Sequence, residues 1–281
     1  MEPTTAAALY TDISLSNLSL VHIAAILALT LPSAALFGYL TGTARRKRLL
    51  KRGKEVERTV SETAQGAFLA LVGLLLAFTF GNSLSIAQSI KAAATDEAAA
   101  LGTAFLRADY LAEPGRTDLK VAIFDYASTR LVPQDEPIDT QAELRTWLET
   151  SLKAQARLWP LTLAATREPT PPPIQAFVAG AVNDALDAHL YRLATHSVPI
   201  AAFTQAVGFA ASVMAVFLLA DRTGLLGRSL TWRVFLFSFL AGLVLYTVVD
   251  VRRGFQGLIR VDQSELRATI FDMDQSLAQR E

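Results

Sequence analysis

The sequence predicts an all-α integral membrane protein, with four transmembrane helices and a helical bundle outside the membrane. Of its 281 residues, 52% are hydrophobic and 19% are charged, and the hydrophobic residues are gathered in long segments without charge. None of the intervening segments shows the alternation of apolar and polar residues that strands favour. About 20 apolar residues in a helix cross a bilayer core, and lipid offers the backbone no hydrogen-bond partner, so the apolar segments must be helices.

Four segments have the length and composition of a membrane span. They are Leu18–Leu40, Ala67–Ile90, Val198–Ala220 and Val234–Val249. The first span is longer than the apolar part of a signal peptide, and its basic cluster follows the apolar run, so we expect it to be retained. Pro32 should kink it locally.

The basic residues of the short loops predict the orientation of the chain. Eight Lys and Arg residues lie between spans one and two, and Arg222, Arg228 and Arg233 lie between spans three and four. Short cytoplasmic loops carry an excess of such residues. We therefore expect both loops in the cytoplasm, with residues 91–197 and the C-terminal tail outside it.

This reading divides the chain into five parts. They are 1–66 (first span and basic loop), 67–90 (second span), 91–197 (extramembrane bundle), 198–249 (third and fourth spans) and 250–281 (tail).

Residues 91–197 read as four helices. The first continues from span two up to Pro114-Gly115, the second covers about 117–131, and the fourth covers 174–196 and leads into span three. The third begins at Thr140 with the spacing of a capping box, and Pro160 should bend or end it. Spans two and three are thus expected to extend beyond the bilayer as long helices that pack with the two middle ones.

A polar stripe in span two is the first candidate site. The candidates for lining a path through the membrane are Phe78, Thr79, Phe80, Asn82, Ser83, Ile86 and Ser89. The polar members and Ile86 fall near one helical face. The apolar members Phe78, Phe80 or Ile86 could gate a water-filled path by dewetting. Alternatively, the polar groups hydrogen-bond to neighbouring helices and hold the bundle together.

Charged residues near the membrane boundary are the second candidate site. They are Lys91, Glu97, Arg107, Asp187, Arg192 and Asp250. They could form an ion or ligand site at the membrane mouth, or form salt bridges between bundle helices, as structural networks do. His189 and His196 share a helix face but match no zinc-binding spacing, so we expect a solvated face and no metal.

Several function classes lack support in the sequence. The 26 basic and 26 acidic residues cancel, so no excess charge points to nucleic acid, and the absence of cysteine excludes thiolate chemistry. We find no phosphate-binding glycine loop, nucleophile elbow or paired-histidine zinc motif. We therefore expect neither an enzyme nor a cofactor.

Three motifs carry a resemblance to a known family. Gly73–Phe80 reads GLLLAFTF, Asp96–Ala98 reads DEA, and Leu101–Arg107 reads LGTAFLR. Their order and spacing resemble the bacterial bestrophin-like domain family, over most of residues 66–267. That resemblance implies a multi-pass protein of the bacterial inner membrane. It also implies a likeness to bestrophins, which are pentameric anion channels lined by their second span, with their extramembrane helices in the cytosol.

Two hypotheses of function follow. The first is a homo-oligomeric channel for small ions, anions being one candidate, with span two lining the path and five subunits by analogy alone. The second is a membrane-anchored sensor or scaffold whose outer bundle binds a ligand or a partner protein. In both cases the lipid bilayer is the first partner of the chain.

Overall fold

The structure of the protein is a computed structural model, and the residues described from it are 18–54, 56, 62–132, 138, 140–167, 169–195, 200–251 and 262–279. In these ranges the regular structure is entirely helical, which confirms the predicted fold class. In chain order the elements are α2 (Leu20–Lys51), α3 (Glu62–Arg107), the 3₁₀ turn η2 (Ala108–Tyr110), α4 (Gly115–Thr129), α5 (Gln141–Ala165), α6 (Pro172–Ala194), α7 (Ile200–Leu225), α8 (Trp232–Val251) and α9 (Ser264–Ala278).

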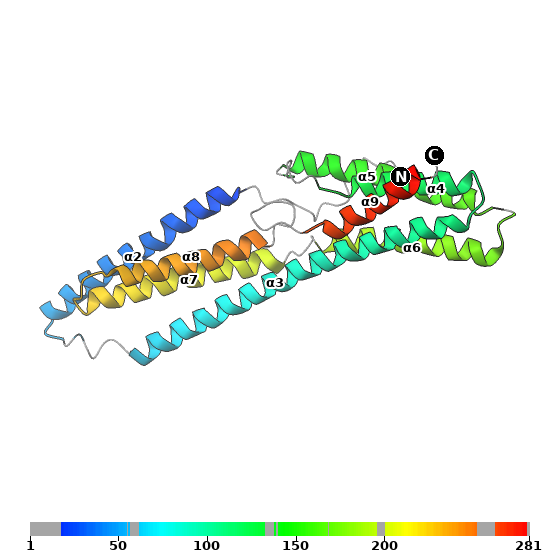
Figure 1. Cartoon of the computed structure of the whole chain (residues 1–281). Helices are drawn as coiled ribbons and strands as arrows, with labels where there is room; N and C mark the ends of the chain where they lie inside the picture. Colours follow the sequence, from blue (N-terminus) through cyan, green and yellow to red (C-terminus); the bar gives the residue numbers. More distant parts are fainter. Residues whose placement is uncertain are drawn as a thin grey trace. The chain divides into compact units, whose positions relative to one another are not determined.

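The chain forms two compact units. The membrane unit contains α2, α3 up to Ser85, α7 and α8, and the bundle unit contains α3 from Ile86 onward, η2, α4, α5, α6 and α9. Figure 1 shows α3 as one continuous helix that contributes to both units.

The membrane unit contains most of each predicted span, and the end of span two, from Ile86 to Ile90, belongs to the bundle unit. Four helices, α2, α3, α7 and α8, are long and apolar enough to cross a bilayer. Of α3, we take the charge-free segment 67–90 as the part inside the membrane. Pro32 lies inside α2, which continues past it to Lys51.

Close backbone contact between α2 and α7 depends on glycine. A Cβ at Gly38 or Gly42 of α2 would collide with a carbonyl oxygen of α7, and one at Gly224 of α7 would collide with the carbonyl oxygen of Tyr39. Small residues four apart let membrane helices approach to backbone contact, where van der Waals packing is strongest. At the same end of the pair, Asp221 accepts hydrogen bonds from Thr41 Oγ1 (3.1 Å) and Arg45 Nη1 (2.8 Å).

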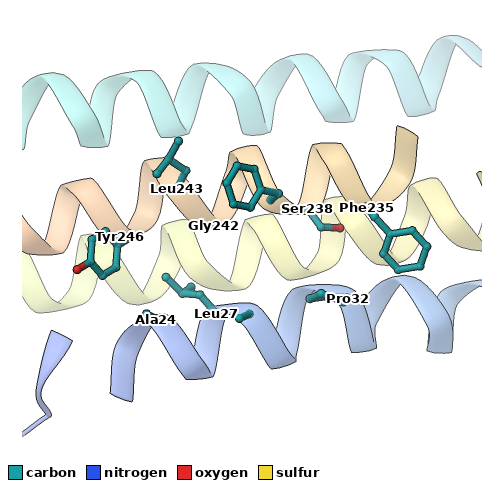
Figure 2. A pocket seen from close by; sticks show the side chains of 10 residues that line it. Ala24, Leu27, Pro32, Phe235, Ser238, Gly242, Leu243 and Tyr246 are labelled. Carbon is teal, nitrogen blue, oxygen red and sulfur yellow. The ribbon is translucent and has the colours of Figure 1, made fainter. Parts of the chain in front are cut away.

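An apolar cavity of about 380 Å³ lies between α2 and α8 of the membrane unit. Figure 2 shows Leu27 and Pro32 on one side, and Phe235, Gly242 and Tyr246 on the other.

The core of the bundle unit is built by α3, α4, α5, α6 and α9. Its fully buried side chains include Leu101, Leu119, Ile123 and Leu158. The predicted capping box of α5 is present, with Thr140 Oγ1 accepting from Glu143 N (3.2 Å) and Glu143 Oε2 accepting from Thr140 N (3.0 Å).

The helix bounds decide one open alternative in the bundle and correct two expectations. Of the two alternatives at Pro160, a bend or an end, the end is excluded, because α5 runs on to Ala165. The helix predicted over 174–196 starts at Pro172, because proline fits the first turn, where its missing N–H is not needed, and it ends at Ala194. It does not run into span three, since α6 ends with Thr195 as its C-cap and α7 is a separate helix.

The tail predicted over 250–281 contains a helix that the sequence analysis did not assign. Helix α9 buries Leu266 and Met273 in the core of the bundle unit. The ammonium group of buried Lys120 on α4 bonds Asp109 (2.7 Å) and reaches Ser276 of α9 (3.4 Å). The C-terminal residues 264–278 are therefore part of the folded bundle.

The close contact at the glycines predicts that the stability of the protein depends strongly on the size of the side chain at these positions of α2. Gly42→Leu should lower the unfolding temperature in detergent, because a side chain there would force the two helices apart at a cost of about 1–3 kcal/mol. Gly73→Leu on α3 is the matched control, since a Cβ at Gly73 meets nothing within 4 Å. Equal unfolding temperatures for the two variants would contradict the contact.

Candidate functional site

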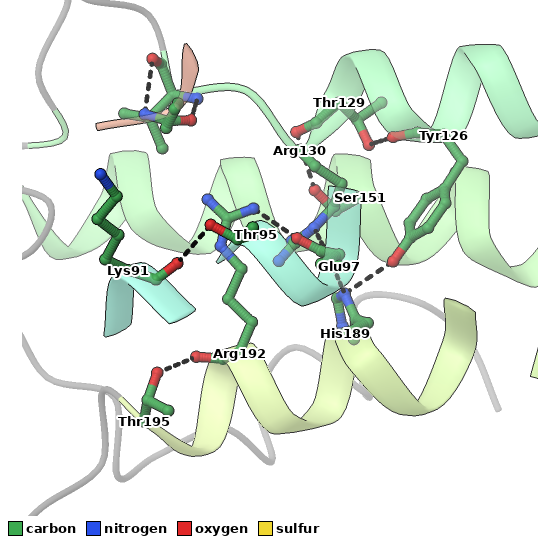
Figure 3. Close-up of polar contacts among 12 residues, drawn as sticks. Lys91, Thr95, Glu97, Tyr126, Thr129, Arg130, Ser151, His189, Arg192 and Thr195 are labelled. Carbon is green, nitrogen blue, oxygen red and sulfur yellow. Dashed lines mark hydrogen bonds and ion pairs between the residues drawn. The ribbon is translucent and has the colours of Figure 1, made fainter. Parts of the chain in front are cut away.

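A buried carboxylate organises the interior of the bundle unit. Glu97 of α3 is fully buried, and each of its oxygens binds a different arginine. Arg130 Nε donates to Glu97 Oε1 at 2.8 Å, and Arg192 Nη1 donates to Glu97 Oε2 at 2.5 Å. Figure 3 shows the carboxylate between the two guanidinium groups.

Both arginines come from helix C-termini. Arg130 is the C-cap of α4, and Arg192 lies in the last turn of α6. Cations are favoured there, because the unpaired carbonyl groups give that end of a helix a partial negative charge. Helix packing thus brings two C-termini, each carrying a positive side chain, to one carboxylate on α3.

A tyrosine and a histidine complete the cluster. Tyr126 Oη and His189 Nδ1 are 2.9 Å apart, and His189 Nδ1 lies 3.8 Å from Glu97 Oε1. The side chains of Tyr126 and His189 are both fully buried. The expectation that His189 lies on a solvated face is wrong, because its face of α6 packs against α3 and α4; His196 lies outside the described residues.

Burial and the arginines set the charge states. Burial, followed by the charge of Arg130, lowers the pKa of His189 to about 3, so its imidazole is neutral near pH 7. Burial by itself raises the pKa of Glu97, but the charges of Arg130 and Arg192 outweigh burial, and the net pKa is lowered. Glu97 is therefore the ionised partner of both arginines.

The other predicted charges are not gathered at one place. Arg107 lies over the Phe177 ring at 4.1 Å and donates to the Phe177 carbonyl, and Asp187 accepts from Asn183 on its own helix. Lys91 lies 3.8 Å from Asp262. Asp250 is buried in α8 of the membrane unit. Within the bundle unit, the structure brings Glu97 and Arg192 together, which is the salt-bridge arrangement.

The predicted polar face of span two is divided in the structure. Thr79 and Ser83 are buried, and their hydroxyls donate to the carbonyls of Leu75 and Thr79 in their own helix. A Cβ at Gly208 of α7 would lie 3.9 Å from Thr79 Oγ1, so this side of α3 faces α7.

The remaining candidates differ in exposure. Asn82, Ser89, Phe78 and Phe80 are exposed, and Ile86 is half-buried.

One line of residues stays exposed along nearly the whole length of α3. We call it the open stripe; its members are Leu71, Leu74, Phe78, Asn82, Ser85, Ser89, Ala92, Asp96, Ala99, Thr103 and Leu106. Successive members of the open stripe are three or four residues apart, and over the ten intervals from Leu71 to Leu106 the average spacing is 3.5 residues. This is the repeat of helices that wind around one another. The open stripe also includes Ser85 and Asp96, which are not among the lining residues predicted from the sequence.

No candidate metal centre is present in the part of the chain that the structure describes. A group of three or more His, Asp or Glu side chains that could hold an ion is not found there.

Apolar spanning helices joined to a helical bundle define the protein as an integral membrane protein. The family model of the Bestrophin-like domain matches residues 24–266, and the chain belongs to that family. The match includes most of the membrane unit, Glu97 and both of its arginines. Searches of curated proteins and of solved structures gave no match.

The Glu97 cluster predicts a large loss of stability when its negative charge is removed. Glu97→Gln keeps the shape of the side chain but leaves two buried guanidinium groups uncompensated, which should cost about 3–5 kcal/mol of unfolding free energy. Asp125→Asn is the control, because Asp125 and Arg157 form an exposed pair worth about 0–1 kcal/mol. Denaturant titration in detergent measures both, and a Glu97→Gln loss no larger than that of the control would contradict the assignment.

The neutral, buried His189 predicts that the unfolding free energy of the protein begins to fall at pH values above those at which carboxylates take up protons. Below its ordinary pKa of 6.5 the unfolded histidine takes up a proton, whereas the folded one stays neutral down to about 3. The unfolding free energy should therefore fall with falling pH, by at most about 1.4 kcal/mol per pH unit. Glu97, with its lowered pKa, adds a loss of the same sign below 4.5.

Denaturant titrations at pH 6.5 and 4.5 test this prediction. His189→Gln should flatten the dependence in that window. Identical slopes for His189→Gln and the wild type would rule out the neutral buried imidazole.

Proposed function

We propose that the protein is a homo-oligomeric channel for small ions, in which the open stripe of α3 lines the path. The observation that supports this most directly is the position of Asn82. It lies within the charge-free segment 67–90, eight residues before Ile90, and it is exposed on the surface of the single chain. Eight residues of helix correspond to about 12 Å of depth.

An amide group at that depth is poorly placed against lipid. Unsatisfied polar groups in hydrocarbon cost several kcal/mol, and polar residues in spanning helices almost always face the inside of a bundle or a water-filled cavity. Ser85 and Ser89 continue the same line of the helix toward the bundle unit. Assembly of several copies with their open stripes toward a common axis would give all three side chains a polar surrounding.

The spacing of the open stripe also suits such an assembly. A repeat of 3.5 residues keeps one seam of a helix facing its neighbours over many turns. Phe78, 69% exposed, precedes the polar members by one turn and would form an apolar ring where a path can close by dewetting. Thr79 and Ser83 lie on a neighbouring, buried face of α3, where Thr79 is close to Gly208 of α7.

Family membership agrees with this proposal, since the family takes its name from channels. We further propose the orientation that the basic loops predict, in a bacterial inner membrane with the bundle unit outside the cytoplasm. A pentamer is the working stoichiometry, by analogy with bestrophins.

Ion flux through proteoliposomes tests the proposal with two neighbouring substitutions. Asn82→Leu should change the flux by roughly tenfold, the factor that corresponds to about 1.4 kcal/mol, because it replaces a polar group of the path by an apolar one. Ser83→Ala is the matched control, since Ser83 is 2% exposed and lies off the open stripe. Its flux should equal that of the wild type.

Two outcomes would contradict the proposal. Wild-type liposomes that remain tight to small monovalent cations and anions would remove the channel function. Flux that changes in Ser83→Ala but not in Asn82→Leu would move the path away from the open stripe.

A further inference from the structure

Three helices of the membrane unit change from apolar to charged at one common end. The apolar segments of α2 and α7 end at Leu40 and Ala220, and that of α8 begins at Val234. The three helices pack against one another through a shared apolar core, and Figure 1 shows them side by side. A change from apolar to charged residues on adjacent spanning helices marks the level at which the hydrocarbon of a bilayer gives way to its headgroups.

Close contacts hold these helix ends together. A Cβ at Gly42 of α2 would collide with the Asp221 carbonyl oxygen of α7, and one at Gly227, between α7 and α8, would collide with the guanidinium group of Arg46. Arg45 of α2 also donates to Asp221 Oδ2 (2.8 Å). The charged end of α2 therefore lies beside the connection between α7 and α8.

This end of the membrane unit carries a large excess of positive charge. Residues 41–62 and 221–233 contain eleven basic and four acidic residues, whereas the whole chain contains 26 of each. We call this surface the basic end; its described cations are Arg45, Arg46, Lys47, Arg48, Lys51, Arg52, Lys54, Arg222, Arg228 and Arg233.

Most of these cations have no anionic partner. Asp221 is the one acid of the basic end whose side chain the structure describes, and it pairs with Arg45. Eight others form neither an ion pair nor a side-chain hydrogen bond in the described part of the chain, and seven of the eight are exposed, while Arg46 is half-buried. These eight are Arg46, Lys47, Arg48, Lys51, Arg52, Lys54, Arg228 and Arg233.

The cations nearest to the hydrocarbon lie within reach of lipid headgroups. Lys47 and Arg48 follow Leu40 by seven and eight residues, which is about 10–12 Å along a helix. The headgroup region extends roughly 5–7 Å beyond the hydrocarbon on each side, and long basic side chains bend toward it. Each cation near an anionic lipid surface increases the affinity for it by a factor of roughly five.

We propose that the basic end binds the headgroups of anionic phospholipids, with Arg46, Lys47 and Arg48 as the principal cations. The phosphodiester of such a lipid is held at this level by its own acyl chains, whereas a free phosphate ion must be drawn from water. A zwitterionic lipid brings no net negative charge to the cations. The site is independent of the proposed channel path, because the basic end is formed by α2, α7 and α8 and the open stripe by α3.

Native mass spectrometry of the full chain tests the proposal. The protein is released from an uncharged detergent that contains equal amounts of phosphatidylglycerol and phosphatidylcholine. The wild type should retain phosphatidylglycerol in preference, and the triple variant Arg46→Gln, Lys47→Gln, Arg48→Gln should bind it roughly a hundredfold more weakly, since it lacks three cations. The preference should also weaken with added salt, which shortens the range of charge attraction.

The matched control removes the same three charges from the bundle unit. The triple variant Arg145→Gln, Lys153→Gln, Arg157→Gln changes two arginines and one lysine at exposed positions of α5, and it should keep the preference of the wild type.

Three outcomes would overturn the proposal. Equal retention of the two lipids by the wild type would do so without any variant, and would leave the basic residues as a signal for orientation alone. An equal loss of preference in the control would show a response to total charge. Displacement of phosphatidylglycerol by millimolar inorganic phosphate would make the free ion the ligand.

Discussion

The ion pairs of Glu97 are the interaction on which the bundle unit depends. One carboxylate of α3 receives a guanidinium group from the end of α4 and another from the end of α6. Because all three side chains are buried, the relative positions of these helices are fixed by charge as well as by apolar packing. Ion pairs of this kind contribute little net stability compared with apolar packing, but they strongly penalise any arrangement that separates them. Their main effect is thus to specify one packing of the bundle.

The membrane unit obeys a different constraint. No water competes for hydrogen bonds in lipid, and apolar surface gains nothing by burial there. Contact between α2 and α7 is made by backbone atoms that approach across Gly38, Gly42 and Gly224. Serine and threonine hydroxyls, such as those of Thr79 and Ser83, bond to the preceding turn of their own helix. Asn82, an amide exposed on α3 within the charge-free segment, is therefore the distinctive polar group.

Helix α3 carries both of these features on different faces. Its inner face presents Thr79 and Ser83 in the membrane unit and Glu97 in the bundle unit, while the open stripe carries Asn82 and Asp96. Because α3 is continuous, the carboxylate that binds the two arginines and the exposed Asn82 belong to one helix.

The sequence by itself determined the four spans, the capping box of α5, the extension of span two into the bundle and the family. These features depend on hydropathy and on interactions between residues that are close together in the chain, so they can be inferred from the sequence. Tertiary structure alone decided that His189 is buried, that Thr79 and Ser83 face inward while Asn82 faces outward, and that α9 belongs to the core. Each of these depends on which distant segments cover a given face, and helical periodicity defines the faces of a helix without saying which one is covered.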